Sequence, residues 1–297
     1  MKRSVLTIGT FDGVHRGHRR ILKIAADRAK KEGFESAAIT FNIPPRLFFF
    51  PSAEPSLLTT VREKVELLRS CGIAKIHVLE FGARLARVSA DAFFKNVILG
   101  KTRASQIVVG YNFGFGRNRE GDTRFLERKG AGHGIPLRVI PPVTYRNVPV
   151  SSGKIRDALK TGDLKRANAL LGYAYFLSGK VVPGQKMGAR LGFPTANLAV
   201  DPAKIVPAGV FAVRVRTPLG KTYGGMCNVG FRPTLAQAGE KVQTVEVHLF
   251  GFSGRLYGKI LRVEFVKKLR AEAAFPSLDH LRRQLSRDRL RAQRALR

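Results

Sequence analysis

Short apolar runs alternate with amphipathic stretches through the first half of the chain. Apolar residues recur at helical spacing over 19–29, and the pattern predicts further helices from Thr60, over 89–99 and near 123–130. Alternating strands and helices predict an α/β fold built on a doubly wound parallel sheet. Ligands of such sheets bind beyond the carboxyl ends of the strands. The runs typical of buried parallel strands lie at 4–8, 36–41, 75–81, 106–110 and 137–140.

The pattern changes in the second half of the chain. Residues 157–172 read as helix, turn and helix, and short strands separated by Gly and Pro turns follow. These strands predict a small antiparallel β-barrel with a terminal helix from Asp279. They lie at 179–184, 209–215, 223–226, 244–250 and 260–266. The change predicts two domains, residues 1–172 and residues 173–297.

The composition is strongly basic, with 53 Lys and Arg against 21 Asp and Glu and a net charge of +32. The excess is spread over both halves, since residues 1–150 carry 26 basic and 12 acidic residues and residues 151–297 carry 27 and 9. A solvated basic surface is the simpler interpretation, and a nucleic-acid or acidic-membrane partner is the alternative. The sequence shows no nucleic-acid motif and no interleaved aromatic set, so only weak nonspecific nucleic-acid binding is expected.

Further features bear on location. No segment has the length of a transmembrane helix and no secretory signal is visible, so no membrane association is expected. Cys71 and Cys227 have no metal or redox spacing, which predicts buried reduced thiols in a cytoplasmic protein.

The first candidate site is the turn Gly-Thr-Phe-Asp-Gly-Val-His-Arg-Gly-His over residues 9–18, called the His turn below. It connects the first strand to the first helix, whose N-terminus is a ready anion site. His15 and His18 lie three residues apart at that entry. Surface histidines, a metal site and a generic Gly-rich turn are the alternatives, but two His without Cys are too few for structural zinc. The context favours imidazole donors that bind a triphosphate and stabilise its developing charge.

This decapeptide resembles the His-x-Gly-His signature of the nucleotidyltransferase superfamily. In its longer form it looks like the adenylyltransferase module of bacterial bifunctional riboflavin kinase/FAD synthetases. Taken alone, it does not separate that module from pantetheine-phosphate or cytidylyl transferases. The resemblance implies nucleotide binding at four further positions of the turn, Gly9, Phe11, Asp12 and Gly17.

A second signature, Val-Ser-Ser-Gly-Lys-Ile-Arg, follows the last predicted strand of the first half at 150–156. Ser151 or Ser152 can cap the helix that begins here, and Arg156 adds a cation to its phosphate-binding N-terminus. The family pattern has Thr where this chain has Gly153, which removes one hydroxyl. Asn112, after the fourth strand, and the Pro44-Pro45 loop also lie at carboxyl ends of strands and can join the same crevice.

The second half carries its own motif, Gly-rich and cationic, over 184–197. Its Pro-Thr-Ala-Asn end places Thr195 and Asn197, hard oxygen donors suited to Mg²⁺ beside phosphates. A flexible surface loop is the alternative. The stretch resembles the signature of riboflavin kinases, which implies that the loop covers ATP phosphates through Lys186, Gly188, Arg190 and Gly192.

Two further positions rest on the same resemblance. Glu246 matches the catalytic glutamate of the family, a carboxylate able to take a proton from a primary alcohol. An exposed strand residue is the alternative for any Glu on such a strand. Arg270 lies in a matching Leu-Arg-Ala-Glu stretch and is expected to bind substrate. Gly251 and Ser253 replace acidic residues that the family often has.

The resemblance covers nearly the whole chain and implies two successive reactions. The barrel would phosphorylate riboflavin to FMN with ATP and Mg²⁺, and the first domain would adenylylate FMN to FAD with a second ATP, releasing pyrophosphate. Two rivals stay open: loss of one activity, and reuse of both folds in nucleic-acid binding.

Overall fold

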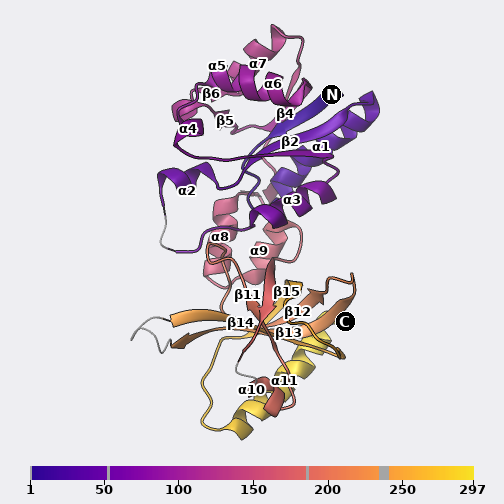
Figure 1. Cartoon of the computed structure of the whole chain (residues 1–297), viewed down its shortest axis with the longest axis vertical. Coiled ribbons are helices and arrows are strands. Elements are labelled where there is room, and N and C mark those ends of the chain that lie inside the picture. Colours follow the sequence, from indigo (N-terminus) through magenta and orange to yellow (C-terminus); the bar gives the residue numbers. More distant parts are fainter. Residues whose placement is uncertain (1, 52–53, 185–186, 234–240) are drawn as a thin grey trace. The chain divides into compact units, whose positions relative to one another are not determined.

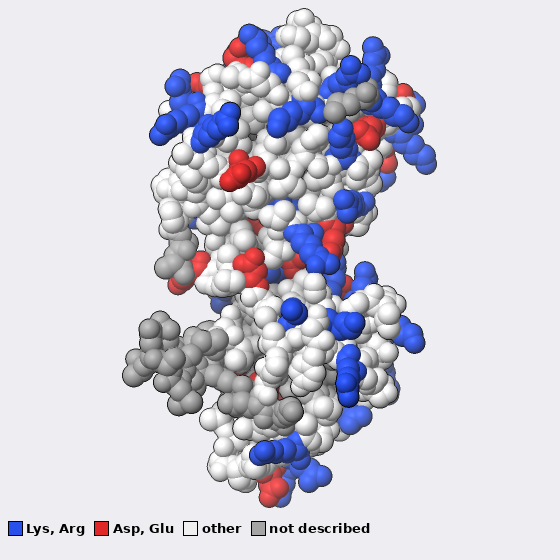
Figure 2. Space-filling model, in the orientation of Figure 1, with Lys and Arg blue, Asp and Glu red and all other residues white. Residues whose placement is uncertain are grey.

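The computed structural model describes residues 2–51, 54–184, 187–233 and 241–297 (Figure 1). The chain divides into two compact units, Met1–Ser152 and Gly153–Arg297, and each is described by itself. On the face drawn in Figure 2, Lys and Arg side chains are scattered over both units rather than gathered in one patch. Over the described residues, no helix combines the length and the apolar character needed to cross a lipid bilayer.

The first unit is built on a five-stranded, fully parallel sheet in the order β3-β2-β1-β4-β7. All five residues of β1 are buried, as a central parallel strand requires. The doubly wound α/β prediction is confirmed. The sheet strands are β1 (Ser4–Ile8), β2 (Glu35–Phe41), β3 (Lys75–Leu79), β4 (Ala104–Gly110) and β7 (Leu137–Ile140).

The helices of this unit follow the expected pattern, with local differences. The longer ones are α1 (Arg16–Glu32), α3 (Val61–Ser70) and α7 (Thr123–Ala131). Thr60 and Glu63 form the predicted capping box at the start of α3. Short helices are α2 (Pro45–Phe49), α4 (Ala83–Ala86), α5 (Ala90–Phe93) and α6 (Gly100–Thr102), with short hairpin strands β5 (Gly114–Phe115), β6 (Gly121–Asp122), β8 (Thr144–Tyr145) and β9 (Val148–Pro149).

Two of the expectations for the first unit were wrong in detail. The Pro44-Pro45 stretch predicted as a loop begins α2, because proline is well suited to the first position of a helix. The helix predicted over 89–99 is not one α-helix, since its second part, Phe94–Leu99, is π-helical. Cys71 is only half-buried, whereas Cys227 is buried, and both are free thiols.

The second unit is a closed six-stranded barrel in the order β10-β11-β14-β13-β12-β15, as the sequence predicted for this half. Its strands pair antiparallel throughout and are β10 (Phe176–Val182), β11 (Ala196–Ala199), β12 (Gly209–Arg216), β13 (Thr222–Pro233), β14 (Lys241–Leu249) and β15 (Ile260–Arg270). Phe211 and Phe265 meet edge to face in the barrel core, with ring centroids 5.0 Å apart.

Helices cover the outside of the barrel. The terminal helix α11 (Leu278–Leu296) begins at the N-cap Ser277 and packs on β12, β13 and β15. The predicted helical pair is α8 (Ser152–Lys160) and α9 (Leu164–Leu171), and α9 packs on β15. The amide of Asn168 on α9 donates to the carbonyl of Phe265 at 2.9 Å, and its oxygen accepts from the Tyr175 N–H at 2.7 Å. The compact second unit therefore begins before residue 172, and the assignment of the two activities to 1–172 and 173–297 stays a prediction.

Candidate functional site

The His turn follows β1 directly and has an unusual backbone. Phe11 (φ 50°) and Val14 (φ 33°) are non-glycine residues with positive φ, and both are buried. Gly9 leaves room for the Phe11 ring, because a Cβ there would lie 3.0 Å from the ring. Gly17 likewise leaves room for the imidazole of His15, 3.2 Å from where a Cβ would be. These two glycines accommodate side chains of the turn itself.

His15 and His18 lie together at the start of α1. Their rings are stacked, with centroids 3.7 Å apart and planes at 17°. His15 caps the helix, since its Nδ1 accepts from the His18 N–H at 3.4 Å. Burial holds the pKa of His18 well below its usual value, and the charges of His15 and Lys64 add to this effect. The His18 Nδ1 atom is buried and has no hydrogen-bond partner among the described residues.

Asp12 is engaged by the chain itself. Its carboxylate accepts hydrogen bonds from Leu58 N at 3.1 Å and from both the N–H and the hydroxyl of Thr59, at 3.0 and 3.1 Å. The side chain is 2% exposed. The geometry therefore gives Asp12 a part in shaping the turn, and direct contact with a nucleotide is not needed to explain it.

The second signature reaches the His turn within the first unit. The hydroxyl of Ser152, the first residue of α8, donates to the Asp12 carbonyl at 2.9 Å. Ser151 is half-buried beside it. Arg156 lies one turn further along α8, in the second unit. Ser152, one of the two serines predicted to bind phosphate, is thus hydrogen-bonded to the same turn that carries the two histidines.

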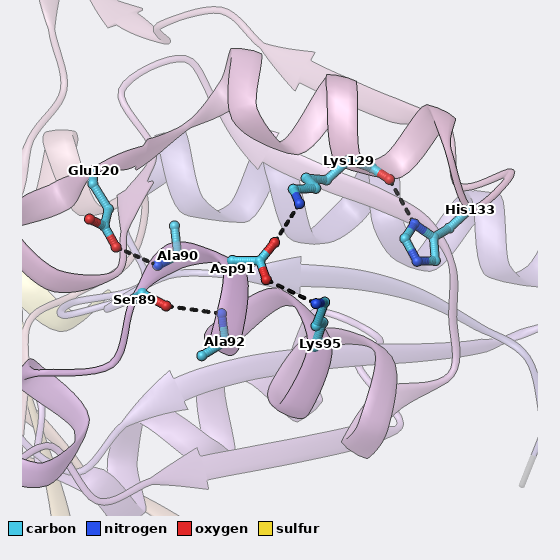
Figure 3. A network of polar contacts seen from close by, with 8 residues as sticks. All are labelled: Ser89, Ala90, Asp91, Ala92, Lys95, Glu120, Lys129 and His133. Carbon is cyan, nitrogen blue, oxygen red and sulfur yellow. Dashed lines mark hydrogen bonds and ion pairs between the residues drawn. The ribbon is translucent and has the colours of Figure 1, made fainter.

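Asn112 lies in the loop after β4, as expected, and is exposed. Its carbonyl accepts from Arg119 Nη2 at 3.2 Å. Figure 3 shows how the end of this loop is held, because the Glu120 carboxylate accepts from the Ala90 N–H at 2.7 Å at the start of α5. Asp91 in the same helix pairs with Lys95, at 3.2 Å, and with Lys129. The loop that carries Asn112 is therefore fixed on a helix terminus.

The second unit contains a cavity of about 250 Å³, called the barrel cavity below. It brings together four of the predicted residues, Gly188, Thr195, Glu246 and Arg270. The other lining residues are mainly apolar and come from α10 (Met187–Arg190), α11 and the neighbouring strands and loops: Met187, Leu191, Phe193, Val210, Met226, Asn228, His248, Glu272, Ala273, Phe275, Leu281 and Leu285. An apolar cavity with a few convergent polar groups is typical of a small-molecule site.

Glu246 lies at the polar side of this cavity. It is half-buried on β14, opposite Asn197 on β11 and Asn228 on β13. The Thr195 hydroxyl donates to its carboxylate at 3.5 Å. The alternative of an exposed strand residue does not apply, since the side chain faces a cavity.

The Gly-rich loop packs directly on the predicted metal ligands. A Cβ on Gly184 would lie 2.1 Å from the Asn197 amide nitrogen. A Cβ on Gly188 would lie 2.4 Å from the Phe193 carbonyl and 3.4 Å from the Thr195 hydroxyl. Only glycine allows this approach. Arg190 and Gly192 are exposed in the same loop, and Lys186 lies outside the described residues.

These residues fit a magnesium ion. The described residues contain no group of three or more His, Cys, Asp or Glu side chains able to hold a metal by themselves. Thr195, Asn197 and Glu246 instead offer a hydroxyl, an amide oxygen and a carboxylate on adjacent segments. Hard oxygen donors of this kind, completed by phosphate and water, are what Mg²⁺ prefers.

Arg270 is held by a residue that the sequence reasoning missed. Its Nε donates to the carboxylate of Asp288 at 2.8 Å, and Asp288 is fully buried. The Gln284 amide donates to the other oxygen of Asp288, also at 2.8 Å. Asp288 falls on the apolar stripe of α11 that includes Leu281 and Leu285, and a lone acid on such a stripe is the signal that could have found it.

Glu272 and His248 were also missed as cavity residues. The Glu272 carboxylate lies against Gly230, where a Cβ would be 1.7 Å from its oxygen. The His248 ring is hydrogen-bonded through Nδ1 to the Pro194 carbonyl at 2.8 Å. Burial lowers the pKa of His248, partly opposed by that carbonyl.

One departure from the family pattern, Gly251, has a local explanation, and the segment 42–45 is held by contacts of its own. Gly251 has φ 64°, a left-handed conformation that favours glycine. Asn42 uses its side-chain oxygen to accept from Ile43 N and Phe81 N, both at 2.8 Å. Pro45 begins α2. Nothing in the structure explains Gly153 or Ser253.

Comparison with known proteins finds one enzyme family in the first half of the chain and another in the second half. The FAD synthetase family matches residues 1–154 and the riboflavin kinase family matches residues 171–296. A crystal structure described as that of a macrolide-efflux protein from Streptococcus pneumoniae has a TM-score of 0.86 at 28% identity, over 98% of this chain and 94% of that one.

Curated relatives match along nearly the whole length. The bifunctional riboflavin kinase/FMN adenylyltransferase of Escherichia coli K12 is 36% identical over 289 residues, covering 97% of this chain and 91% of the relative. The protein of the same description from Bacillus subtilis 168 is 32% identical over 294 residues, covering 98% and 92%. The chain therefore belongs to the bifunctional riboflavin kinase/FMN adenylyltransferase family.

Proposed function

We propose that the chain converts riboflavin to FMN in the barrel and FMN to FAD at the His turn, using one ATP in each reaction. Family membership supports the pair of activities. The observation that carries the assignment of residues is the barrel cavity, where Thr195 and Glu246 meet at 3.5 Å beside a loop whose glycines pack on Thr195 and Asn197. The division of the activities between residues 1–172 and 173–297 belongs to this proposal.

In riboflavin phosphorylation, Glu246 acts as the base. Its carboxylate accepts the proton of the riboflavin 5′-hydroxyl as that oxygen attacks the γ-phosphorus of ATP, the bond from that phosphorus to the β-phosphate oxygen breaks and ADP leaves. Thr195 and Asn197 would hold Mg²⁺, which neutralises charge on the phosphates when bound. The loop over 184–192 covers the phosphates through Lys186, Gly188, Arg190 and Gly192. Arg270, fixed by Asp288, binds substrate in the cavity.

In adenylyl transfer, the FMN phosphate attacks the α-phosphorus of ATP and pyrophosphate leaves. The chain supplies positioning and charge stabilisation rather than a covalent intermediate. His15 and His18 donate to the triphosphate, and the stacking of their two rings at the start of α1 supports this role. Other contributors proposed are backbone and side chains of the turn (Gly9, Phe11, Asp12 and Gly17), the α8 residues Ser151, Ser152 and Arg156, and Asn112.

Location in the cytoplasm completes the proposal, and two free thiols support it. The test is a time course of purified protein with riboflavin, ATP and Mg²⁺, with flavins separated by chromatography. FMN is expected first and FAD after it. Accumulation of FMN without FAD would favour a chain that has lost adenylyl transfer, and no FMN from riboflavin would contradict the kinase assignment.

A further inference from the structure

A buried lysine lies against the His turn, and neither reaction described above gives it a task. Lys64 is on α3 and is only 2% exposed. Its ammonium donates to the carbonyl oxygens of Thr10, at 3.2 Å, and of Phe41, at 2.5 Å. Thr10 follows β1 and Phe41 ends β2, so one side chain joins the carboxyl ends of two neighbouring strands. Burying an ammonium is costly, and a fold keeps one only where it is hydrogen-bonded and of use.

The turn that Lys64 contacts does not hold its shape by backbone preference. The positive φ values of Phe11 and Val14 are unfavourable for non-glycine residues and persist only where the surroundings impose them. Thr10, at the start of this segment, is fixed twice, because its carbonyl also accepts from the Thr40 hydroxyl at 3.0 Å. Removing Lys64 takes away one of these two constraints.

The charge of Lys64 acts on titratable groups packed around it. These are Asp12 in the His turn and His18 at the start of α1, and the charge of His15 also acts on His18. Glu63 is next to Lys64 on α3, and its carboxylate accepts from Thr60 N at 3.0 Å in the capping box. Burial lowers the pKa of Lys64 to about 8, and the Asp12 charge opposes that shift. At neutral pH Lys64 is therefore mostly a cation, and its charge helps to keep His18 neutral.

We propose that Lys64 is a positioning residue for adenylyl transfer: its ammonium fixes the strained His turn and places a buried positive charge behind the two histidines. Lys64 acts through Thr10 and His18 rather than by touching the substrate. A fixed charge in a low-dielectric site stabilises the phosphate charge that develops as pyrophosphate leaves. The inference rests on the proposed assignment of adenylyl transfer to the His turn.

The test uses the full chain with FMN, ATP and Mg²⁺ and measures kcat and KM for FAD formation from about pH 6 to about pH 10. Lys64→Met removes the charge at similar length, and Lys64→Arg keeps a charge that does not titrate in this range. Lys31→Met, an exposed lysine near the end of α1, is the matched control.

We expect wild-type kcat/KM to fall on the alkaline side with an apparent pKa of about 8 as Lys64 loses its proton. Lys64→Met should lower kcat by on the order of 10², and its rate should not fall near pH 8. The acid limb of its pH profile should move to higher pH, because His18 loses a positively charged neighbour. Lys64→Arg should recover part of the lost rate and lack the alkaline fall. Lys31→Met should match wild type.

A purely structural role would lower the rate of Lys64→Met equally at every pH, and parallel profiles for the two proteins would overturn the proposal. An alkaline fall near pH 8 that persists in Lys64→Arg would also overturn the proposal. If Lys64→Met does not fold, the pH profile of Lys64→Arg is the test. A wild-type protein that forms no FAD from the supplied FMN at any pH would contradict the proposed function itself, which separates the two failures.

Discussion

The carboxylate of Asp288 is fully buried on α11, where it pairs with Arg270 and accepts from Gln284. Arg270 is partly exposed and lines the barrel cavity. A buried carboxylate with two good partners is stable, but its removal leaves the arginine without a counter-charge. Asp288 therefore determines the direction of a guanidinium that we propose binds substrate.

Asp288→Asn should lower the free energy of unfolding by ~3 kcal/mol, at the lower end for a broken buried pair because Arg270 is partly exposed. It should also raise KM in riboflavin phosphorylation. Chemical denaturation and initial rates measure both. The control is Asp279→Asn, an exposed acid on the same helix, which should stay within about 0.5 kcal/mol of wild type. An unchanged KM in a folded Asp288→Asn protein would contradict the role given to Arg270.

At the scale of residues, motif spacing was informative where chemistry is presented at turns and loops. His15 and His18 lie together as predicted, and Thr195 and Glu246 meet in one cavity. Lys64 and Asp288 were missed because each interacts with a residue distant in sequence, Thr10 and Arg270. The role of a buried charged residue can be inferred only when its interaction partner is known. The apolar pattern around the residue does not identify that partner.

At the scale of elements, the Gly-rich loop packs against β11 and the residues just before it. Gly184 lies against the Asn197 amide and Gly188 against Thr195, so the loop backbone and the predicted metal ligands fix each other. A β-carbon on either glycine must move a ligand or the loop. This coupling explains why the glycines are needed here even without reference to a bound phosphate.

Gly184→Ala should displace the Asn197 side chain and lower the rate of riboflavin phosphorylation by on the order of 10², the cost of misplacing a positioning group by about 1 Å. The Mg²⁺ concentration for half-maximal rate should rise. FAD formation from supplied FMN should not change. Gly82→Ala is the control, because a β-carbon there meets nothing within 4 Å. An unchanged Mg²⁺ dependence would argue against Asn197 as a metal ligand.

Element types were predictable, but their bounds and irregularities were not. The sheet strands and the capping box of α3 follow from periodicity and from local hydrogen-bonding chemistry. The π-helical segment Phe94–Leu99 and the helix α2 at Pro45–Phe49 do not, because both depend on packing that a linear pattern does not contain. The short strand β11 was hidden within a motif interpreted only for its chemistry.

At the scale of the whole molecule, the two compact units suggest that each activity resides in a separable part. A fragment of residues 153–297 should form FMN and no FAD. A fragment of residues 173–297 should do the same but be less stable, because it lacks the Asn168 contacts to Phe265 and Tyr175. Product chromatography and thermal unfolding test this, and FAD formation by either fragment would show the assignment to be wrong.

The net charge of +32 is a property of the whole chain, and the visible Lys and Arg side chains are spread over both units (Figure 2). We expect weak, sequence-independent binding to duplex DNA at low salt that is negligible near physiological salt. The logarithm of the binding constant should fall with the logarithm of salt concentration by about 0.9 per phosphate neutralised. A salt titration with labelled duplexes of unrelated sequence measures it. Sequence preference, or binding that survives physiological salt, would favour a nucleic-acid role.

The central claim is that one chain carries two separate phosphate-transfer sites, and paired variants test it most directly. Each is given riboflavin or FMN with ATP and Mg²⁺, and both flavin products are followed over time. His18→Ala should form FMN from riboflavin normally while FAD formation falls by roughly 10²–10³, the cost of one preorganised donor. Glu246→Gln should form FAD from FMN but almost no FMN from riboflavin. Loss of both activities in either folded variant, or of neither, would contradict the two-site account.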